Sequence, residues 1–176
     1  MSERVWYRSL YWRIALGLIA FLALMLAAQG YQVALVARST DVTQALASAL
    51  DGARAYKCDV TDAAAVERTF SAIRTELGEV EVLVYNPGGG VWANVEEITP
   101  QDFEASWRTN VLGALLASKQ VIPAMKQRRR GSIVFIGATA SRRGVARTAA
   151  FAPAKAAQKS LAESMARHLW PAGIHV

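Results

Sequence analysis

Residues 31–37 read YQVALVA, a short apolar run with β-branched valines that begins directly after Gly30. A run of this kind predicts a strand that is buried on both faces, as in a parallel sheet. Further strands are predicted at residues 53–58, 79–85 (EVEVLVY), 132–136 (SIVFI) and 173–176. The sheet built from these runs is therefore expected to form the core of the fold.

Helical segments separate the strands, and several carry start or stop signals. Thr99 before Pro100 is a favoured helix start. In the helix predicted at residues 61–77, Val66, Phe70 and Ile73 share one face, and Gly78 ends the helix. Helices are predicted at residues 41–50, 61–77, 99–126 and 149–168. Strands that alternate with helices predict an α/β fold with a doubly wound parallel sheet of the Rossmann type. Because the last strand has only begun where the chain stops, we expect this sheet to be incomplete at one or both ends.

An apolar segment precedes the first of these strands. Residues 14–28, IALGLIAFLALMLAA, contain no polar side chain, and Arg4, Arg8 and Arg13 come before them. A basic flank before an apolar run is typical of a membrane anchor, although a full span needs about 20 residues. We interpret the segment as a core helix of a single domain over residues 14–176 behind a basic tip, residues 1–13. A membrane anchor is the alternative.

Composition limits the classes of function. The chain has 176 residues with one cysteine and two histidines, so we expect neither a disulfide framework nor a metal site. The net charge of +6 is modest, and the basic run at residues 126–130 (KQRRR) lacks the interleaved aromatics of a nucleic-acid surface. We therefore expect a solvated turn there and no nucleic-acid partner. A cytoplasmic location is expected, with membrane association as the alternative.

Four local features recur in a fixed order, and three of them lie where strands end, which is where parallel sheets bind ligands. Those three are Ala37-Arg38, Asp59-Val60 and Asn86-Pro87-Gly88, and the fourth is Asn110 in a long helix, followed by a strand and then Phe151-x-x-x-Lys155. This set, with phrases such as GYQVALVARS, WRTNVLGALL and GIHV, resembles the short-chain dehydrogenase/reductase family over nearly the whole chain from about residue 17. The resemblance implies an oxidoreductase that transfers a hydride between NADP and the carbonyl or alcohol carbon of a small molecule.

The resemblance also assigns cofactor-binding positions. The family's G-x-x-x-G-x-G turn falls on Arg13, Gly17 and Ile19, so only Gly17 is retained, and two side chains would crowd the pyrophosphate. Arg38 matches the cation that holds the 2′-phosphate of NADP, which makes NAD the less favoured cofactor. A solvated arginine at a strand end is the alternative for Arg38.

Three further positions match the adenine and nicotinamide sides of the family's site. Asp59 and Val60 match the pair that contacts adenine, although Asp59 is also a common turn residue before Thr61. Asn86 and Gly88 match the family's Asn-Ala-Gly motif, which packs beside the cofactor. Pro87 departs from that motif and removes a backbone donor.

The catalytic set is only partly present. Family catalysis uses a tyrosine, a lysine four residues on that lowers the tyrosine's pKa and holds the cofactor's ribose, a serine that orients the substrate carbonyl, and a helix asparagine that anchors a water relay. Lys155 and Asn110 match, but the tyrosine position is Phe151, which has no proton to give, and the serine position is Ala138.

Ser141, or Thr139, would have to supply the missing hydroxyl. Weak or absent turnover is therefore expected. The alternative is a catalytically inactive binding or scaffold protein, tethered to a membrane through residues 14–28. The segments 102–126 and 151–168 are long helices rich in alanine and leucine, and members of the family pair the corresponding helices between subunits. A homo-oligomer is therefore expected.

Overall fold

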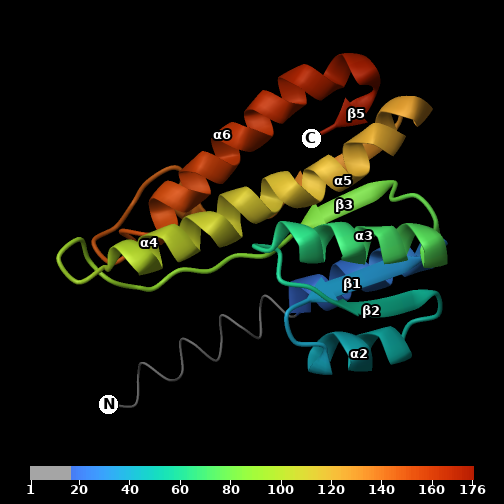
Figure 1. The fold of residues 1–176 in the computed structure, drawn as a ribbon, viewed down its shortest axis with the longest axis horizontal. Helices are drawn as coiled ribbons and strands as arrows, with labels where there is room; N and C mark the ends of the chain where they lie inside the picture. The colour runs from blue at the N-terminus through green and yellow to red at the C-terminus, as the bar shows by residue number, and fades with distance from the viewer. Residues whose placement is uncertain (1–16) are drawn as a thin grey trace. The chain divides into compact units, whose positions relative to one another are not determined.

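The computed structural model describes residues 17–176. The chain groups into two compact units, residues 1–58 and residues 59–176, and each is described by itself. Figure 1 colours the chain from its N-terminus in blue to its C-terminus in red. The predicted basic tip and the glycine-turn position at residue 13 lie outside the described residues. The prediction of a single domain over residues 14–176 stays a prediction.

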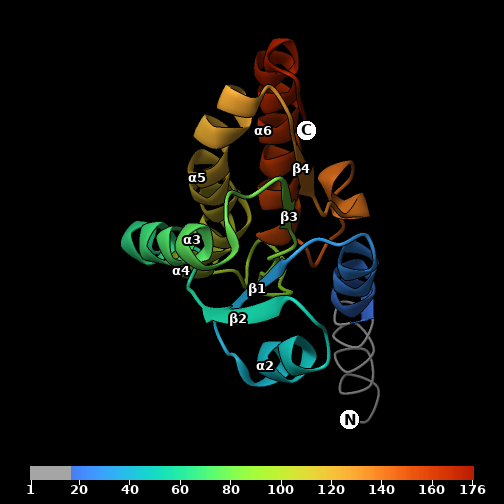
Figure 2. The same cartoon turned by 90° about the vertical axis from the view of Figure 1, so that its right-hand side faces the viewer.

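The first unit is a helix followed by a parallel strand pair. The described helix covers residues 17–28. Gly30, two residues later, has a φ of 82° and turns the chain into the next strand. The elements that follow are β1 (Val33–Ala37), α2 (Asp41–Ser48) and β2 (Ala53–Lys57). In the parallel register Val33 is paired with Ala53. Figure 2 shows α2 beside this pair.

The helix over residues 17–28 buries one side and exposes the other. Ala23 is buried with Val33, Leu35 and Ala47, whereas the side chains of Phe21, Leu24 and Met25 are about half exposed. This packing agrees with the core-helix interpretation for one side of the helix. Among residues 17–176, no helix combines the length and the apolar character that crossing a bilayer requires. Membrane association stays a prediction.

The second unit is a parallel sheet with helices. Its strands have the order β3-β4-β5, and Val82 of β3 is paired with Ser132 of β4. The elements are α3 (Ala63–Leu77), β3 (Val82–Tyr85), α4 (Pro100–Trp107), the π-helical turn η1 (Arg108–Leu112), α5 (Gly113–Arg128), β4 (Gly131–Phe135), the 3₁₀ turn η2 (Thr139–Ser141), α6 (Phe151–Leu169), the 3₁₀ turn η3 (Trp170–Ala172) and β5 (Ile174–His175). The described strands are all parallel, as predicted.

Helix α3 forms as its sequence predicts. The Asp62 carboxylate accepts the backbone N–H groups of Ala64 and Ala65, and the helix ends at Gly78. Val66, Phe70 and Ile73 are buried, as the face assignment predicted.

The predicted helix over residues 99–126 is wrong in one respect. Thr99 caps it and Pro100 opens it, but the π-helical turn at residues 108–112 separates α4 from α5. The hydroxyl of the buried Tyr85 donates to the carbonyl of Thr109 within this turn, at 2.5 Å. A π turn inserts extra backbone into a helix and is often found at functional sites, and this one contains Asn110.

The basic run at residues 126–130 is not merely a solvated turn. Arg128 donates to the carbonyl of Val80 at 2.9 Å, and Arg130 pairs with Glu81 at 3.1 Å. Both contacts join the end of α5 to the segment that leads into β3. The run therefore ties two elements of the second unit together.

Replacing Gly173 with alanine should destabilise the second unit by about 2 kcal/mol or more. Gly173 has a φ of 77°, and a Cβ atom there would collide with the backbone carbonyl of Arg129. Gly137 is the matched control, because a Cβ atom there meets no atom within 4 Å. Urea denaturation of Gly173→Ala and Gly137→Ala would measure the difference, and equal stabilities would contradict it.

Candidate functional site

Lys155 lies in the first turns of α6 with its side chain buried. It is 4% exposed, and its Nζ donates to the carbonyl of Ile136 and to Oε1 of Gln158, each at 2.9 Å. Burial lowers the pKa of Lys155 from 10.5 to about 8, because an ammonium is poorly solvated there. The side chain is therefore charged at neutral pH but close to its titration range.

Asn110 is held by the π-helical turn with its amide group fully buried. Its Nδ2 donates to the carbonyl of Gly89 at 2.8 Å and to that of Ser106 at 2.7 Å. Its Oδ1 accepts no hydrogen bond from residues 17–176, although it is buried. Buried polar atoms are normally paired, so an orphan acceptor marks a place where a ligand or water completes the bonding.

Gly88 brings these two side chains to one corner. A Cβ atom on Gly88 would lie 3.5 Å from Nζ of Lys155 and 3.6 Å from Oδ1 of Asn110. The loop after β3, the π turn and α6 thus meet at a donor and an acceptor. Of the site residues predicted from the sequence, the structure brings these three together.

The chemistry of this corner fits a hydroxyl-bearing ligand. An ammonium has three donors, and the described residues occupy two of them on Lys155. A hydroxyl group can accept from the third donor and donate to Oδ1 of Asn110. The ribose of a nicotinamide cofactor carries such groups, so this half of the site fits a nicotinamide dinucleotide.

Phe151 takes the position of the missing phenol and is packed as an apolar residue. It is 7% exposed, and its ring centroid lies 5.8 Å from that of Trp92 and 5.9 Å from Nζ of Lys155. The aromatic ring thus retains contact with the lysine. Phe151 supplies no proton, because a phenyl ring has no titratable group.

Two hydroxyl groups are candidates to replace the family's serine, whose position in this chain is Ala138. Both lie in η2. Ser141 donates its hydroxyl to the carbonyl of Ala138 at 2.7 Å, while Thr139 is exposed. The local bond engages the proton of Ser141 and leaves its oxygen lone pairs as acceptors. The structure thus places Ser141 in the loop after β4 but shows no bond from it to Lys155 or Asn110.

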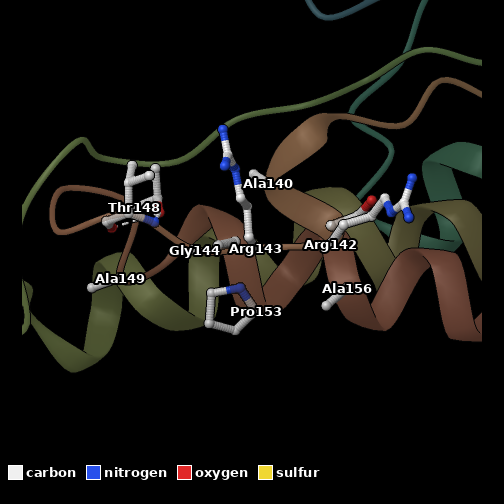
Figure 3. Close-up of a pocket in the computed structure, with 11 residues that line it drawn as sticks. Ala140, Arg142, Arg143, Gly144, Thr148, Ala149, Pro153 and Ala156 are labelled. Atoms are coloured by element: carbon white, nitrogen blue, oxygen red, sulfur yellow. Dashed lines mark hydrogen bonds between the residues drawn. The ribbon is translucent and has the colours of Figure 1, made fainter.

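Ser141 also borders a shallow pocket of about 330 Å³ between this loop and α6. Its α6 side is formed by Ala152, Pro153 and Ala156, and neither Phe151 nor Lys155 lines it. In Figure 3 the guanidinium groups of Arg142 and Arg143 extend away from Pro153. The pocket is therefore distinct from the corner around Lys155.

Asp59 and Val60 open the second unit. The Asp59 carboxylate accepts the backbone N–H and the hydroxyl of Thr61, at 2.9 and 2.8 Å, so it forms the predicted turn. The carbonyl of Val60 would lie 3.0 Å from a Cβ atom on Gly113, which shows how closely α5 approaches it. Asn86 is half-buried directly after β3. Contact of these residues with a cofactor stays a prediction.

Gly17 and Arg38 belong to the first unit. Gly17 is exposed at the start of the described helix, and Ile19 is half-buried two residues further along. An isoleucine in the helix does not offer the close backbone approach that a pyrophosphate needs, so this half of the cofactor fits less well. Arg38 is exposed directly after β1, where a 2′-phosphate could reach it. Their roles stay predictions.

Two residues of the site were missed by sequence reasoning. Ser106 is 2% exposed, and its hydroxyl lies within hydrogen-bonding distance of the carbonyls of Gly89 and Ala150, at 3.0 and 3.2 Å. Gln158 is 1% exposed and contacts Lys155. Their spacing, four residues before Asn110 and three after Lys155, places each on the same helix face as its partner and could have identified them.

Comparison with known proteins agrees with this arrangement. The short chain dehydrogenase family model matches residues 15–176. The 3-oxoacyl-[acyl-carrier-protein] reductase MabA of Mycobacterium tuberculosis H37Rv is 33% identical over 153 residues, which are 87% of this chain. An NAD⁺-bound xylitol dehydrogenase aligns with a TM-score of 0.85 at 30% identity, over 92% of this chain and 64% of that one. An actinorhodin polyketide ketoreductase with NADPH aligns with a TM-score of 0.85 at 26% identity, over 89% of this chain and 62% of that one.

The chain spans 59% of the length of the mycobacterial reductase. The match nevertheless covers nearly all of the chain, and it includes the strands, the long helices and the corner around Lys155. With its Rossmann-type α/β fold, the chain belongs to the short-chain dehydrogenase/reductase family, a family of oxidoreductases.

Proposed function

We propose that the chain is an NADP-linked oxidoreductase of small carbonyl or alcohol compounds with a weakened proton-transfer step. The observation that supports this most is the corner where Lys155, Asn110 and Gly88 meet. Its buried lysine and its orphan acceptor are arranged for a ligand that carries hydroxyl groups. In the rest of the family's catalytic set, the tyrosine position is Phe151 and the serine position is Ala138.

NADP, when bound, supplies or accepts a hydride at C4 of its nicotinamide. In this proposal Lys155 binds the ribose hydroxyls and Asn110 anchors a water beside it. Arg38 binds the 2′-phosphate, which favours NADP over NAD. The structural relatives carry either cofactor by name, one with NAD⁺ and one with NADPH.

Proton transfer limits the rate in this proposal. Reduction of a carbonyl places negative charge on its oxygen, and a positioned acid normally neutralises it. Phe151 supplies no such proton, and Ala138 supplies no hydroxyl to orient the carbonyl. Ser141 or Thr139 is left to donate, directly or through water.

The unmodified chain should oxidise NADPH very slowly with a panel of small ketones and aldehydes. Phe151→Tyr alone should raise the rate less than about tenfold, because residues that act as a unit do not contribute additively. Phe151→Tyr with Ala138→Ser, Arg13→Gly and Ile19→Gly should restore NADP binding first and raise the rate by about 10²–10⁴. Absorbance at the NADPH band measures the rate.

Phe103→Tyr is the control, because it adds the same hydroxyl at an exposed position of α4. Robust NADPH oxidation by the unmodified chain would show that another group supplies the proton. Failure of both the unmodified and the repaired chain to bind NADP would contradict the proposed function itself.

NADP binding should weaken above pH 8. The pKa of Lys155 is about 8, so its ammonium is charged below that pH and loses its charge above it. A charged donor binds a hydroxyl more strongly than a neutral amine, and the dissociation constant should rise about tenfold from pH 7 to pH 9.5. Calorimetric titration across this range would test the pH dependence.

Lys155→Met should bind weakly at pH 7 and show no such pH dependence. Lys159→Met is the matched control, because Lys159 lies on the same helix but is exposed and paired with Glu163. The same pH profile in the wild type and in Lys155→Met would exclude this role for Lys155.

A catalytically inactive binding or scaffold protein is the second candidate function. It is favoured by the contact between the rings of Phe151 and Trp92, which leaves the position of the acid without a polar group. A scaffold requires no hydride transfer. NADPH that binds but is never oxidised by the repaired chain would favour this candidate.

A homo-oligomer is expected through the face of α4 and α5. Phe103 and Trp107 are each 43% exposed, and Leu115 is 39% exposed on the same run of helices. Pairing of this face between two subunits would bury these side chains. Light scattering after size exclusion should show a dimer that Trp107→Arg dissociates and Val95→Arg leaves intact, whereas a monomer at high concentration would contradict the expectation.

A further inference from the structure

Gln158 is a buried polar residue on a helix face whose other buried residues, apart from Lys155, are apolar. It lies three residues after Lys155 on α6, and only 1% of its surface is exposed. The neighbouring buried positions of this helix include Phe151, Ala152 and Ala154. A buried amide among such residues is costly unless it has a specific partner.

The orientation of the Gln158 amide follows from its partner. Nζ of Lys155 can only donate, so the group that faces it at 2.9 Å must be the carbonyl oxygen Oε1. The amide nitrogen Nε2 then points elsewhere, and it finds no acceptor among residues 17–176. The Gln158 side chain thus accepts a hydrogen bond from the lysine at Oε1, while Nε2 has no partner among the described residues.

We infer that Gln158 is a positioning residue that, together with the carbonyl of Ile136, holds Nζ of Lys155 in place and leaves its third donor for a ligand. The two acceptors each lie 2.9 Å from Nζ. They come from α6 itself and from the end of β4, so they restrain the flexible lysine side chain from two directions. This inference deepens the proposed function, because it concerns the lysine that would bind the ribose.

The same contact acts on the charge of the lysine. Burial favours the neutral amine, whereas an acceptor such as Oε1 favours the charged ammonium. The groups around Nζ are Gly88 from the loop after β3, Asn110 from the π turn, the Ile136 carbonyl, and Phe151 and Gln158 from α6. None of these groups carries a charge, and burial is the cause of the lowered pKa. Removing the acceptor should therefore lower the pKa further.

The experiment measures the titration of Lys155 directly. The chain has five lysines, Lys57, Lys119, Lys126, Lys155 and Lys159. An NMR spectrum of protein labelled with ¹³C-lysine therefore contains few lysine signals. Lys155→Met identifies the signal of interest by its loss. The wild type should titrate near pH 8.

The two substitutions of Gln158 should move this midpoint in opposite directions. Gln158→Leu should lower it by about one pH unit, because the ammonium loses an acceptor. Gln158→Glu should raise it, because a carboxylate of the same size favours the charged form. A role of Gln158 in packing alone would not give shifts of opposite sign.

Controls separate this effect from a general disturbance of the fold. The other four lysines should keep their midpoints in both variants. Ser118→Ala removes another buried polar group, which bonds only within α5 to the carbonyl of Ala114, and it should leave the Lys155 midpoint unchanged. If Gln158→Leu does not fold, the upward shift in Gln158→Glu still decides, and an unchanged or lower midpoint there overturns the inference.

The outcome is independent of cofactor binding. Opposite shifts in a chain that binds no NADP would support the role of Gln158 and contradict the proposed function. A chain that binds NADP, but whose Lys155 midpoint is the same in the wild type, Gln158→Leu and Gln158→Glu, would support the proposed function and overturn the inference.

Discussion

The two hydrogen bonds donated by the amide of Asn110 organise the candidate site. One joins the π turn to the loop after β3 at Gly89, and the other closes onto Ser106 one helical turn earlier. The bond to Ser106 is buried and the bond to Gly89 is partly buried, and each contributes about 1 kcal/mol. The amide nitrogen is fully used in this way, so the oxygen Oδ1 is directed to the corner that Gly88 and Lys155 share. The orphan acceptor is thus a consequence of the structural role of Asn110.

The site combines retained geometry with reduced chemistry. The position of Phe151 is fixed by its packing against Trp92 and by the close approach of Gly90, whose Cβ atom would lie 3.2 Å from that of Phe151. None of these contacts involves a hydroxyl group. Packing can therefore preserve the shape of a catalytic centre after its proton donor is lost, since a phenyl ring and a phenol ring have nearly the same shape. Lys155 is likewise held by two neutral acceptors and needs no phenol to remain in place.

The residues that our proposal assigns to the cofactor come from both units of the chain. The second unit carries the corner that fits ribose hydroxyl groups, while the first carries Arg38 and the described helix that includes Gly17. Ile19 in that helix is unfavourable for a pyrophosphate, which needs glycine backbone at close range. The affinity for NADP in our proposal therefore depends more on Lys155 and Arg38 than on the glycine turn, which is the opposite of the usual balance at a Rossmann site.

The sequence by itself determined the alternation of strands and helices, the helix start at Thr99 and the absence of side-chain hydroxyl groups at positions 138 and 151. These features depend on local periodicity and on residue identity, which are readable along the chain. Only the tertiary structure decided the π turn around Asn110, because its backbone accepts a hydrogen bond from a residue outside the helix, the Tyr85 hydroxyl, and the helix sequence does not reveal that contact. It also decided the contacts of Ser106 and Gln158 and the lowered pKa of Lys155. Helix spacing places Ser106 near Asn110 and Gln158 near Lys155, but burial and the carbonyl partners of Ser106 and Lys155, 17 to 44 residues away in the chain, depend on how the elements pack.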